Sequence, residues 1–413
     1  MMNKYIITVS YGDYTFGSGG TDKVILSQQQ ILNNAGYNVI SISPFKNCNF
    51  WDVLLNGRFD GVYSNSRFIS LLSSINDCRL SAIILHHLKD VNIDLLADIL
   101  DYCDVPIFYY LHDYYTICPF SGLIQEDGTF CGNGFPSENK CVGCSYCKQS
   151  IKLSKKIQLL IKKYSNRITF ITPSEAAKEV WAKDYPEYRD KVKVIYHQEL
   201  QGEYRSNNAI LQDSEPIRIA FVGYQKPLKG WKEFKDATTK ANQLGLNEQF
   251  YQFGWGEEKF PYIEQVDVDF KKSITAMTDS LREEKMHVAV LWSLWPETYA
   301  YTYYEALAAN CFVITNENSG NICAQVKARN NGIVVSDLSE ILCNESKLRK
   351  LVNGFRANEH IVPEELIENE DFLSLISDTD WCPKRVRKVV DYSNVLTLLK
   401  KSKRMIKDWI KRV

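Results

Sequence analysis

Short apolar runs alternate with longer amphipathic stretches along almost the whole chain. In the first half, runs of strand length cover 5–9, 39–42, 61–63, 82–85, 106–111 and 168–171. A polar segment follows at 200–216, and further runs cover 217–223, 249–253, 287–292, 311–315 and 332–335. Buried strands separated by helices are typical of parallel sheets covered on both faces. The pattern therefore predicts an α/β protein with two doubly wound units joined by a linker at 200–216.

Length and composition agree with this picture. A chain of 413 residues exceeds what one hydrophobic core usually serves, so two domains are expected. Its net charge of −1 argues against binding to bulk nucleic acid, and no apolar run reaches the roughly 18 residues of a membrane span. The first residues resemble a strand and lack the features of a signal peptide. We therefore expect a cytoplasmic protein whose twelve cysteines are mostly reduced.

The most informative segment surrounds two glutamates. Glu297 follows an apolar run, and Glu305 comes after seven intervening residues within a helical stretch that precedes the next apolar run. Glu179 and Glu187 have the same spacing by chance, so the strand–turn–helix–strand context distinguishes the first pair. Carboxylates at such a turn and two helical turns later can hold a polyol ligand from two sides, at the edge of the sheet where ligands bind in α/β folds.

Glycine-rich turns open both units. Gly19 and Gly20 follow the first strand, and Gly223 ends the first strand of the second unit. Glycines allow backbone N–H groups to approach a ligand, and a helix N-terminus favours negative charge. The spaced G-x-G-x-x-G fingerprint of dinucleotide sites is absent. Lys226 and Lys229 follow Gly223 and could contact a diphosphate, although ordinary turns and solvated lysines would give the same sequence.

Two other groups of residues could form sites. His112 ends a strand and is placed to meet a ligand or to form a structural hydrogen bond. Five cysteines fall in a segment with little apolar content, which predicts a structural zinc site at Cys118, Cys131, Cys141 and Cys144. Because Cys141, Cys144 and Cys147 form C-x2-C-x2-C, an iron–sulfur cluster is one alternative, and free thiols are another.

The C-terminal segment 391–413 is predicted to be an amphipathic helix rich in lysine and arginine. Two interpretations stay open. The helix could contact an anionic membrane surface through 395–413, where each basic residue contributes about 1 kcal/mol, or it could pack its apolar stripe on the protein.

Together these residues resemble the retaining glycosyltransferases of family-4 type, which have the GT-B fold of two Rossmann-like domains facing a cleft. The resemblance covers about 1–335, and its most specific part is 291–315. It implies that Gly19 and Gly20 lie beside the donor diphosphate and that His112 contacts the transferred sugar or the acceptor. It also implies that Glu297 lies at the donor sugar, that Thr298 and Tyr299 turn backbone amides toward phosphate, and that Glu305 receives the ribose hydroxyls.

Some positions depart from the family pattern. Tyr224 stands where many relatives have an arginine, Ala300 replaces a frequent glycine, and 196–199 replace a typical turn between the domains. The cysteines resemble those of a subset linked to bacterial surface polysaccharides. No convincing Asp-x-Asp pair occurs at a strand end, so no catalytic metal or other catalytic cofactor is expected, and a structural zinc is the one cofactor considered.

The sequence thus predicts a cytoplasmic enzyme that moves a sugar from a nucleotide-diphosphate donor to a lipid-linked or growing saccharide. The expected domains are an acceptor-side domain at 1–204 with a cysteine-rich insertion at 114–150, a donor domain at 205–390, and the terminal helix. A nucleotide-sugar epimerase or a sugar phosphorylase would share the fold. Tyr224 leaves room for a non-catalytic sugar-nucleotide-binding partner in a glycan assembly complex.

Overall fold

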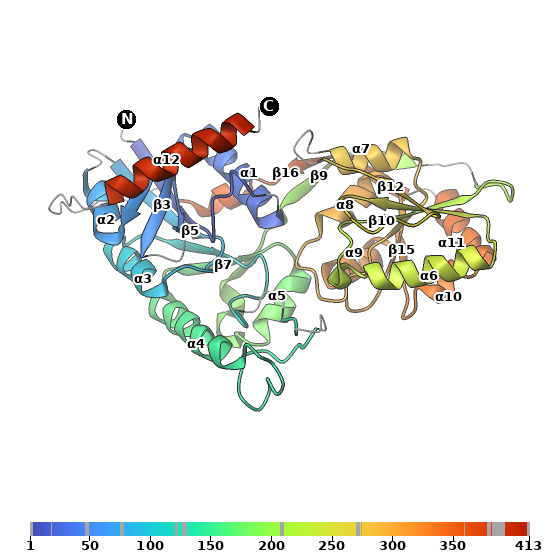
Figure 1. Cartoon of the computed structure of the whole chain (residues 1–413), viewed down its shortest axis with the longest axis horizontal. Helices are drawn as coiled ribbons and strands as arrows, with labels where there is room; N and C mark the ends of the chain where they lie inside the picture. The colour runs from blue at the N-terminus through green and yellow to red at the C-terminus, as the bar shows by residue number, and fades with distance from the viewer. Residues whose placement is uncertain are drawn as a thin grey trace.

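The structure is a computed structural model of the chain. It describes residues 3–17, 19–45, 49–74, 78–119, 123–125, 130–206, 210–269, 273, 275–358, 360–377, 381 and 393–410. Within these residues the chain forms two α/β units joined by a two-stranded antiparallel sheet (Figure 1).

The N-terminal unit contains an eight-stranded sheet in the order β4-β3-β2-β1-β5-β6-β7-β8. Only β3 runs antiparallel to its neighbours β2 and β4. The strands are β1 (Asn3–Val9), β2 (Tyr37–Pro44), β3 (Phe50–Leu55), β4 (Arg58–Ser64), β5 (Cys78–Leu85), β6 (Ile107–Tyr110), β7 (Ile168–Thr172) and β8 (Val192–Val194). The helices are α1 (Gly20–Asn34), α2 (Asn65–Ser74), α3 (Ile93–Tyr102), α4 (Cys147–Tyr164), α5 (Glu175–Ala182) and the 3-10 turn η1 (Pro186–Lys191).

The C-terminal unit contains a six-stranded, fully parallel sheet in the order β12-β11-β10-β13-β14-β15. Its strands are β10 (Ile217–Val222), β11 (Glu248–Phe253), β12 (Ile263–Val266), β13 (Val288–Val290), β14 (Phe312–Thr315) and β15 (Gly332–Val334). Its helices are η2 (Pro227–Lys229), α6 (Trp231–Gln243), α7 (Ala276–Glu283), α8 (Tyr301–Ala308), α9 (Asn321–Arg329), α10 (Ser339–Leu342) and α11 (Glu345–Ala357). The strand order reverses between β10 and β13, which is the switch point where ligands bind in such sheets.

Both sheets are covered on both faces, which explains their continuous apolar runs. In β1, Ile7 belongs to the core cluster on one face and its neighbour Ile6 to the cluster on the other, and both are fully buried. In β10, Phe221 and Val222 divide between two clusters in the same way. The two doubly wound units predicted from the apolar pattern are therefore confirmed.

The chain crosses between the units twice. Strand β9 (Gln198–Ser206) leads into the C-terminal unit, and β16 (His360–Glu368) returns beside it in antiparallel pairing. The segment predicted as a polar linker at 200–216 thus begins inside a strand. After β16, the turn η3 (Asp371–Leu375) places Phe372 in a core cluster of the N-terminal unit, although this residue falls in the range expected for the second domain.

The C-terminal helix α12 (Ser393–Ile410) lies along the N-terminal unit (Figure 1). Lys400 pairs with the buried carboxylate of Asp52 in β3, and Arg404 pairs with Asp13. The Thr397 hydroxyl accepts a hydrogen bond from the backbone N–H of Val62 at 2.9 Å. Of the two interpretations, packing on the protein is therefore observed for the first part of the helix. No helix in the described ranges has both the length and the apolar character to cross a bilayer.

Candidate functional site

Residues that follow the strands of both sheets meet at the boundary between the units. Thr298, which lies after β13, donates its hydroxyl to the backbone oxygen of His112 after β6, at 2.6 Å. The backbone oxygen of Thr298 accepts a hydrogen bond from the Ser174 hydroxyl after β7, also at 2.6 Å. These bonds connect positions that are more than 120 residues apart in sequence. The carboxyl ends of the two sheets therefore meet at Thr298.

Two further contacts hold the same segment. The Tyr114 hydroxyl donates to the backbone oxygen of Pro296 at 3.1 Å, and the backbone N–H of Gln198 in β9 donates to the Tyr299 hydroxyl at 3.1 Å. The segment 296–299 is thus fixed by the N-terminal unit on several sides. The turn that carries Glu297 therefore lies at the boundary between the units.

Glu297 lies at the switch point with its carboxylate already paired. Its side chain is 8% exposed, and it forms an ion pair with Lys229 from η2. The Ser293 hydroxyl donates to the same carboxylate oxygen at 3.1 Å. The backbone of Glu297 packs directly against Gly320. Because Gly320 has a φ of +62° and lies so close to this backbone, there is no room for a side chain at residue 320. A Cβ at residue 320 would come within 2.6 Å of the Glu297 nitrogen. The site thus combines one acidic and one basic group on adjacent strand ends.

The turn between Glu297 and α8 contains a non-glycine residue with a positive φ angle. Ala300 is the N-cap of α8 and has φ +67°, in the left-handed region that favours glycine. The departure from the family glycine noted in the sequence thus falls where a Cβ costs energy. The turn is held by the Asn321 side-chain amide, which donates to the backbone oxygen of Tyr299 at 2.7 Å.

Glu305 lies in the second turn of α8 and is 2% exposed. Neither carboxylate oxygen has a hydrogen-bond partner among the described residues. Burial raises the pKa of Glu305 to about 7, and the nearby charge of Lys23 partly offsets this effect. The Lys23 ammonium, from α1 of the other unit, lies 4.0 Å from the carboxylate. A buried carboxyl with unused acceptor positions is suited to hydroxyl groups of a ligand.

The glycine turn after β1 forms the start of α1. Gly19 is the N-cap, and its backbone N–H donates to the Asp22 carboxylate at 3.1 Å. Gly20 faces the ring of Tyr301, to which a Cβ would come no closer than 3.9 Å. Steric need for glycine is instead strongest at Gly17, where a Cβ would overlap the Asp22 carboxylate. Of the predicted pair, Gly20 thus lies near Tyr301, the first residue of α8, so the first turns of the two helices are close together.

The turn after β10 contains both lysines that were predicted to contact a diphosphate, and their side chains lie in different places. Gly223 has φ +135° and open space around it. Lys229 reaches Glu297, whereas Lys226 is exposed and lies over the ring of Tyr224 at 6.0 Å. Gly230, with φ +78°, allows the start of α6 to pack directly on the backbone of Trp292. The structure therefore brings Lys229, but not Lys226, to the glutamate.

His112 belongs to a row of stacked rings rather than standing alone. Its Nε2 lies 3.2 Å from Nδ1 of His86, and the two rings are nearly parallel. The ring of His197 lies 5.8 Å from that of His112 and stacks in turn on Tyr301 at 5.7 Å. Burial lowers the pKa of His86 and of His197 to about 3, and it lowers that of His112 well below its usual range. These imidazoles are therefore neutral at pH 7 and act as hydrogen-bonding groups.

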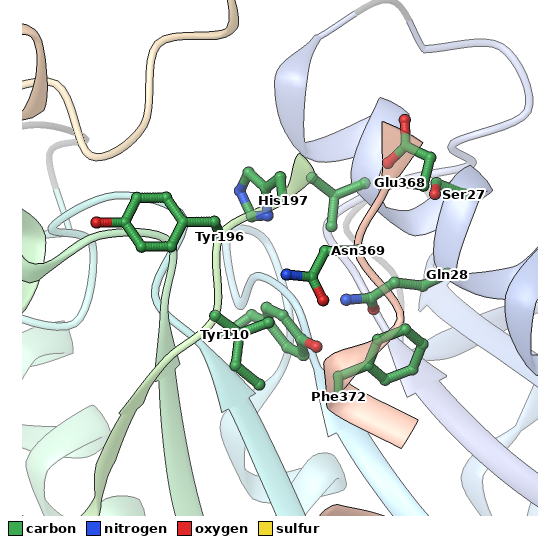
Figure 2. Close-up of a pocket in the computed structure, with 10 residues that line it drawn as sticks. Ser27, Gln28, Tyr110, Tyr196, His197, Glu368, Asn369 and Phe372 are labelled. Atoms are coloured by element: carbon green, nitrogen blue, oxygen red, sulfur yellow. The ribbon is translucent and has the colours of Figure 1, made fainter. Parts of the chain in front are cut away.

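A small polar pocket lies beside this row, where the chain crosses between the units (Figure 2). Its lining residues include Gln28 of α1, Tyr110 of β6, His197, Phe372 and Glu368 of β16. The side-chain oxygen of Gln28 and one oxygen of Glu368 are buried there without a hydrogen-bond partner in the described part of the chain. The pocket thus lies between helix α1 of the N-terminal unit and the returning strand β16.

The four cysteines predicted to bind zinc are not gathered. Cys118 and Cys131 pack against the N-terminal core, whereas Cys141 and Cys144 form the turns before α4. Within the described ranges, no group of three or more His, Cys, Asp or Glu side chains is placed to hold a metal ion. The structure gives the zinc prediction no support, and elemental analysis of the purified protein is its test.

Several residues of the site were missed by sequence reasoning. Ser293, Gly320 and Asn321 support the turn that carries Glu297, and Lys23 faces Glu305. Only Gly320 left a sequence signal, because a glycine in the polar turn 316–320 between a strand and a helix often marks a position of positive φ. The others are common polar residues whose partners are distant in sequence.

Comparison with known proteins gives a fold but no sequence relative. No protein-family model matches the chain, and no curated protein matches its sequence. Among solved structures, the chain is similar to sucrose-phosphate synthase from Thermosynechococcus elongatus, with 13% identity and a TM-score of 0.53 over 86% of this chain and 94% of that one. It is also similar to HepE from Anabaena in complex with UDP and glucose, with 12% identity and a TM-score of 0.50 over 86% and 94%. The chain therefore has the GT-B fold predicted from the sequence, which these solved structures share.

Proposed function

We propose that the protein is a glycosyltransferase that moves a sugar from a nucleotide-diphosphate donor to a lipid-linked or growing saccharide, with retention at the anomeric carbon. The observation that carries the proposal is the pair of buried carboxyls at the switch point of the C-terminal sheet. Glu297 pairs with Lys229 at the turn, and Glu305 follows in α8 with both oxygens unpartnered among the described residues. The likeness of fold to HepE, whose structure contains UDP and glucose, agrees with it.

We propose a role for each site residue from the family resemblance and from its place in the structure. Lys229 and the neighbouring N-termini of α1 and α8 would stabilise the negative charge that develops on the departing diphosphate. Glu305 would accept hydrogen bonds from the ribose hydroxyls. Glu297 would hold the donor sugar, and its carboxylate would stabilise the positive charge that develops at the anomeric carbon. His112, neutral because of its burial, would offer a hydrogen bond to the sugar or the acceptor.

We also propose that transfer needs no metal ion. Lys229 already supplies a positive charge beside Glu297. The candidate pair Asp267 and Asp269 follows β12, at the outer edge of the sheet, two strands away from β10. Activity that is unchanged in EDTA would support this part of the proposal, and activity restored only by Mg²⁺ or Mn²⁺ would contradict it.

The acceptor belongs on the N-terminal side of the boundary. Sequence resemblance favours a saccharide of a bacterial surface polysaccharide, and peripheral contact with a membrane through 395–413 would bring the protein to a lipid-linked acceptor. Leu398 and Leu399 in α12 are 66% and 59% exposed, so this helix keeps apolar side chains on its outer side.

The test combines binding and turnover. Thermal unfolding with UDP, GDP, TDP, ADP and CMP, and with their sugars, should show stabilisation by one base. A ligand at about 100 times its dissociation constant adds about 2.7 kcal/mol of stability. Glu297→Ala and His112→Ala should lower transfer far more than nucleotide affinity, and a fully active double variant would refute the site.

Two outcomes would favour the alternatives. Nucleotide binding without turnover on any acceptor would indicate the non-catalytic partner. Conversion of the donor without an acceptor would indicate an epimerase.

A further inference from the structure

Lys23 is a charged residue that no part of the proposed chemistry uses. It lies in the first turn of α1, and its side chain is 26% exposed. Its ammonium lies 4.0 Å from a carboxylate oxygen of Glu305 and 4.2 Å from the centre of the Tyr301 ring. Both partners belong to α8 of the opposite unit, so Lys23 spans the boundary between the units.

The charge of Lys23 acts on two carboxyl groups. Besides Glu305 on α8, the charge of Lys23 acts on Glu368 of β16, whose pKa is raised by burial and lowered again by Ser27 and Lys23. His197 on the crossing strand also feels this charge, and its pKa is already low because it is buried. Lys23 is thus the cation that acts on two carboxyls, one from the C-terminal unit and one from the returning strand.

The distance shows what kind of contact this is. At 4.0 Å the ammonium balances the charge of Glu305 without taking its acceptor positions, and both carboxylate oxygens lack a hydrogen-bond partner among the described residues. A cation that occupied these positions would compete with a ligand. The Lys23 ammonium lies beside the carboxylate oxygens instead, so it favours their negative charge and leaves their acceptor positions open to a ligand.

We propose that Lys23 is a positioning residue that keeps Glu305 ionised when the two units close, so that the carboxylate can accept hydrogen bonds from the nucleotide. This inference rests on the proposed function of Glu305 as a ribose ligand. Lys23 itself touches neither the sugar nor the diphosphate. Its effect is confined to the charge state of its partner, and it operates only while α1 and α8 are in contact.

The first arm of the test measures nucleotide affinity against pH for wild type, Lys23→Met and Lys23→Arg. The probe is whichever of UDP, GDP, ADP or TDP stabilises the wild type. Removing an opposite charge at about 4 Å raises the pKa of a carboxyl by about one pH unit or more. If the midpoint of the affinity profile, which reports the ionisation of Glu305, moves from about pH 7 to about pH 8, the Lys23→Met variant loses about fivefold in affinity at pH 7. At pH 9 it loses almost nothing. Lys23→Arg keeps the wild-type profile.

Three results would overturn the proposal. A Lys23→Met profile identical to wild type would show that the charge is not needed. An equal loss at every pH would mean that Lys23 contacts the ligand directly. Tighter binding by Lys23→Met would mean that Lys23 competes with the ligand.

The second arm needs no ligand and separates this inference from the proposed function. Urea unfolding at pH 8 compares Lys23→Met in the wild-type and in the Glu305→Gln background. Lys23→Met should destabilise the wild-type protein clearly and the Glu305→Gln protein much less, because glutamine carries no charge for Lys23 to balance. Equal destabilisation in both backgrounds would overturn the role of Lys23. If no nucleotide binds the wild type, the proposed function fails while this comparison still decides the Lys23–Glu305 coupling.

Discussion

Replacing Glu305 with glutamine should change the stability of the ligand-free protein in a pH-dependent way, so that the variant gains stability relative to wild type as the pH rises. Burial raises the pKa of Glu305 from 4.5 to about 7 in the folded state. The folded protein therefore holds this proton more tightly than the unfolded chain does. The resulting cost is absent below about pH 4.5, grows between pH 4.5 and 7, and is constant above.

The magnitude follows from the same difference. Each pH unit of pKa difference corresponds to about 1.36 kcal/mol, so the rise from 4.5 to about 7 costs about 3 kcal/mol at alkaline pH. Most of this amount, about 2–3 kcal/mol, develops between pH 5 and pH 8. The glutamine amide is also buried and needs partners, which adds an offset of about 1–3 kcal/mol that does not vary with pH. The pH-dependent part is therefore the signal.

Urea unfolding of wild type and Glu305→Gln at pH 5, 6, 7 and 8, followed by tryptophan fluorescence, measures this difference. The matched control is Glu257→Gln, because Glu257 is exposed in the loop after β11. A difference in the free energy of unfolding that stays flat from pH 5 to pH 8 would refute the reasoning. It would mean that Glu305 is solvated in the ligand-free protein.

Three further changes test the turn that carries Glu297. Ala300→Gly should stabilise the protein by up to about 1 kcal/mol. A left-handed backbone costs about 1–2 kcal/mol in a residue with a Cβ, and the greater entropy of glycine in the unfolded chain offsets part of the gain. Lower stability in thermal unfolding would contradict this prediction. Gly320→Ala should cost about 2–4 kcal/mol in the same assay, because its Cβ would collide with the Glu297 backbone, and a wild-type melting temperature would argue against this close approach. Thr298→Val, compared with Thr298→Ser, should cost about 1–2 kcal/mol by leaving the His112 carbonyl without its donor, whereas equal stability of the two variants would show that the hydroxyl is not needed.

The sequence was sufficient where the signal is local. Strands buried on both faces must be apolar, so β1, β10 and β13 could be located from their runs alone. Residues after such strands reach the carboxyl edge of a sheet, and this placed Glu297 and His112 at the boundary. The strand β3 was missed because Asp52 and its partner Lys400 form a buried pair that the apolar pattern does not reveal.

Tertiary structure decided what depends on distant partners. The polar strand β9 is a strand because β16 pairs with it some 160 residues later in the chain. His86 and His112 become one unit only when β5 and β6 are neighbours, and Lys23 meets Glu305 only when α1 and α8 face each other. Sequence alone determined which residues lie at strand ends, because burial acts on each strand separately. Which of these residues share a charge or a proton is a matter of a few ångströms between separate units, and only the folded chain sets those distances.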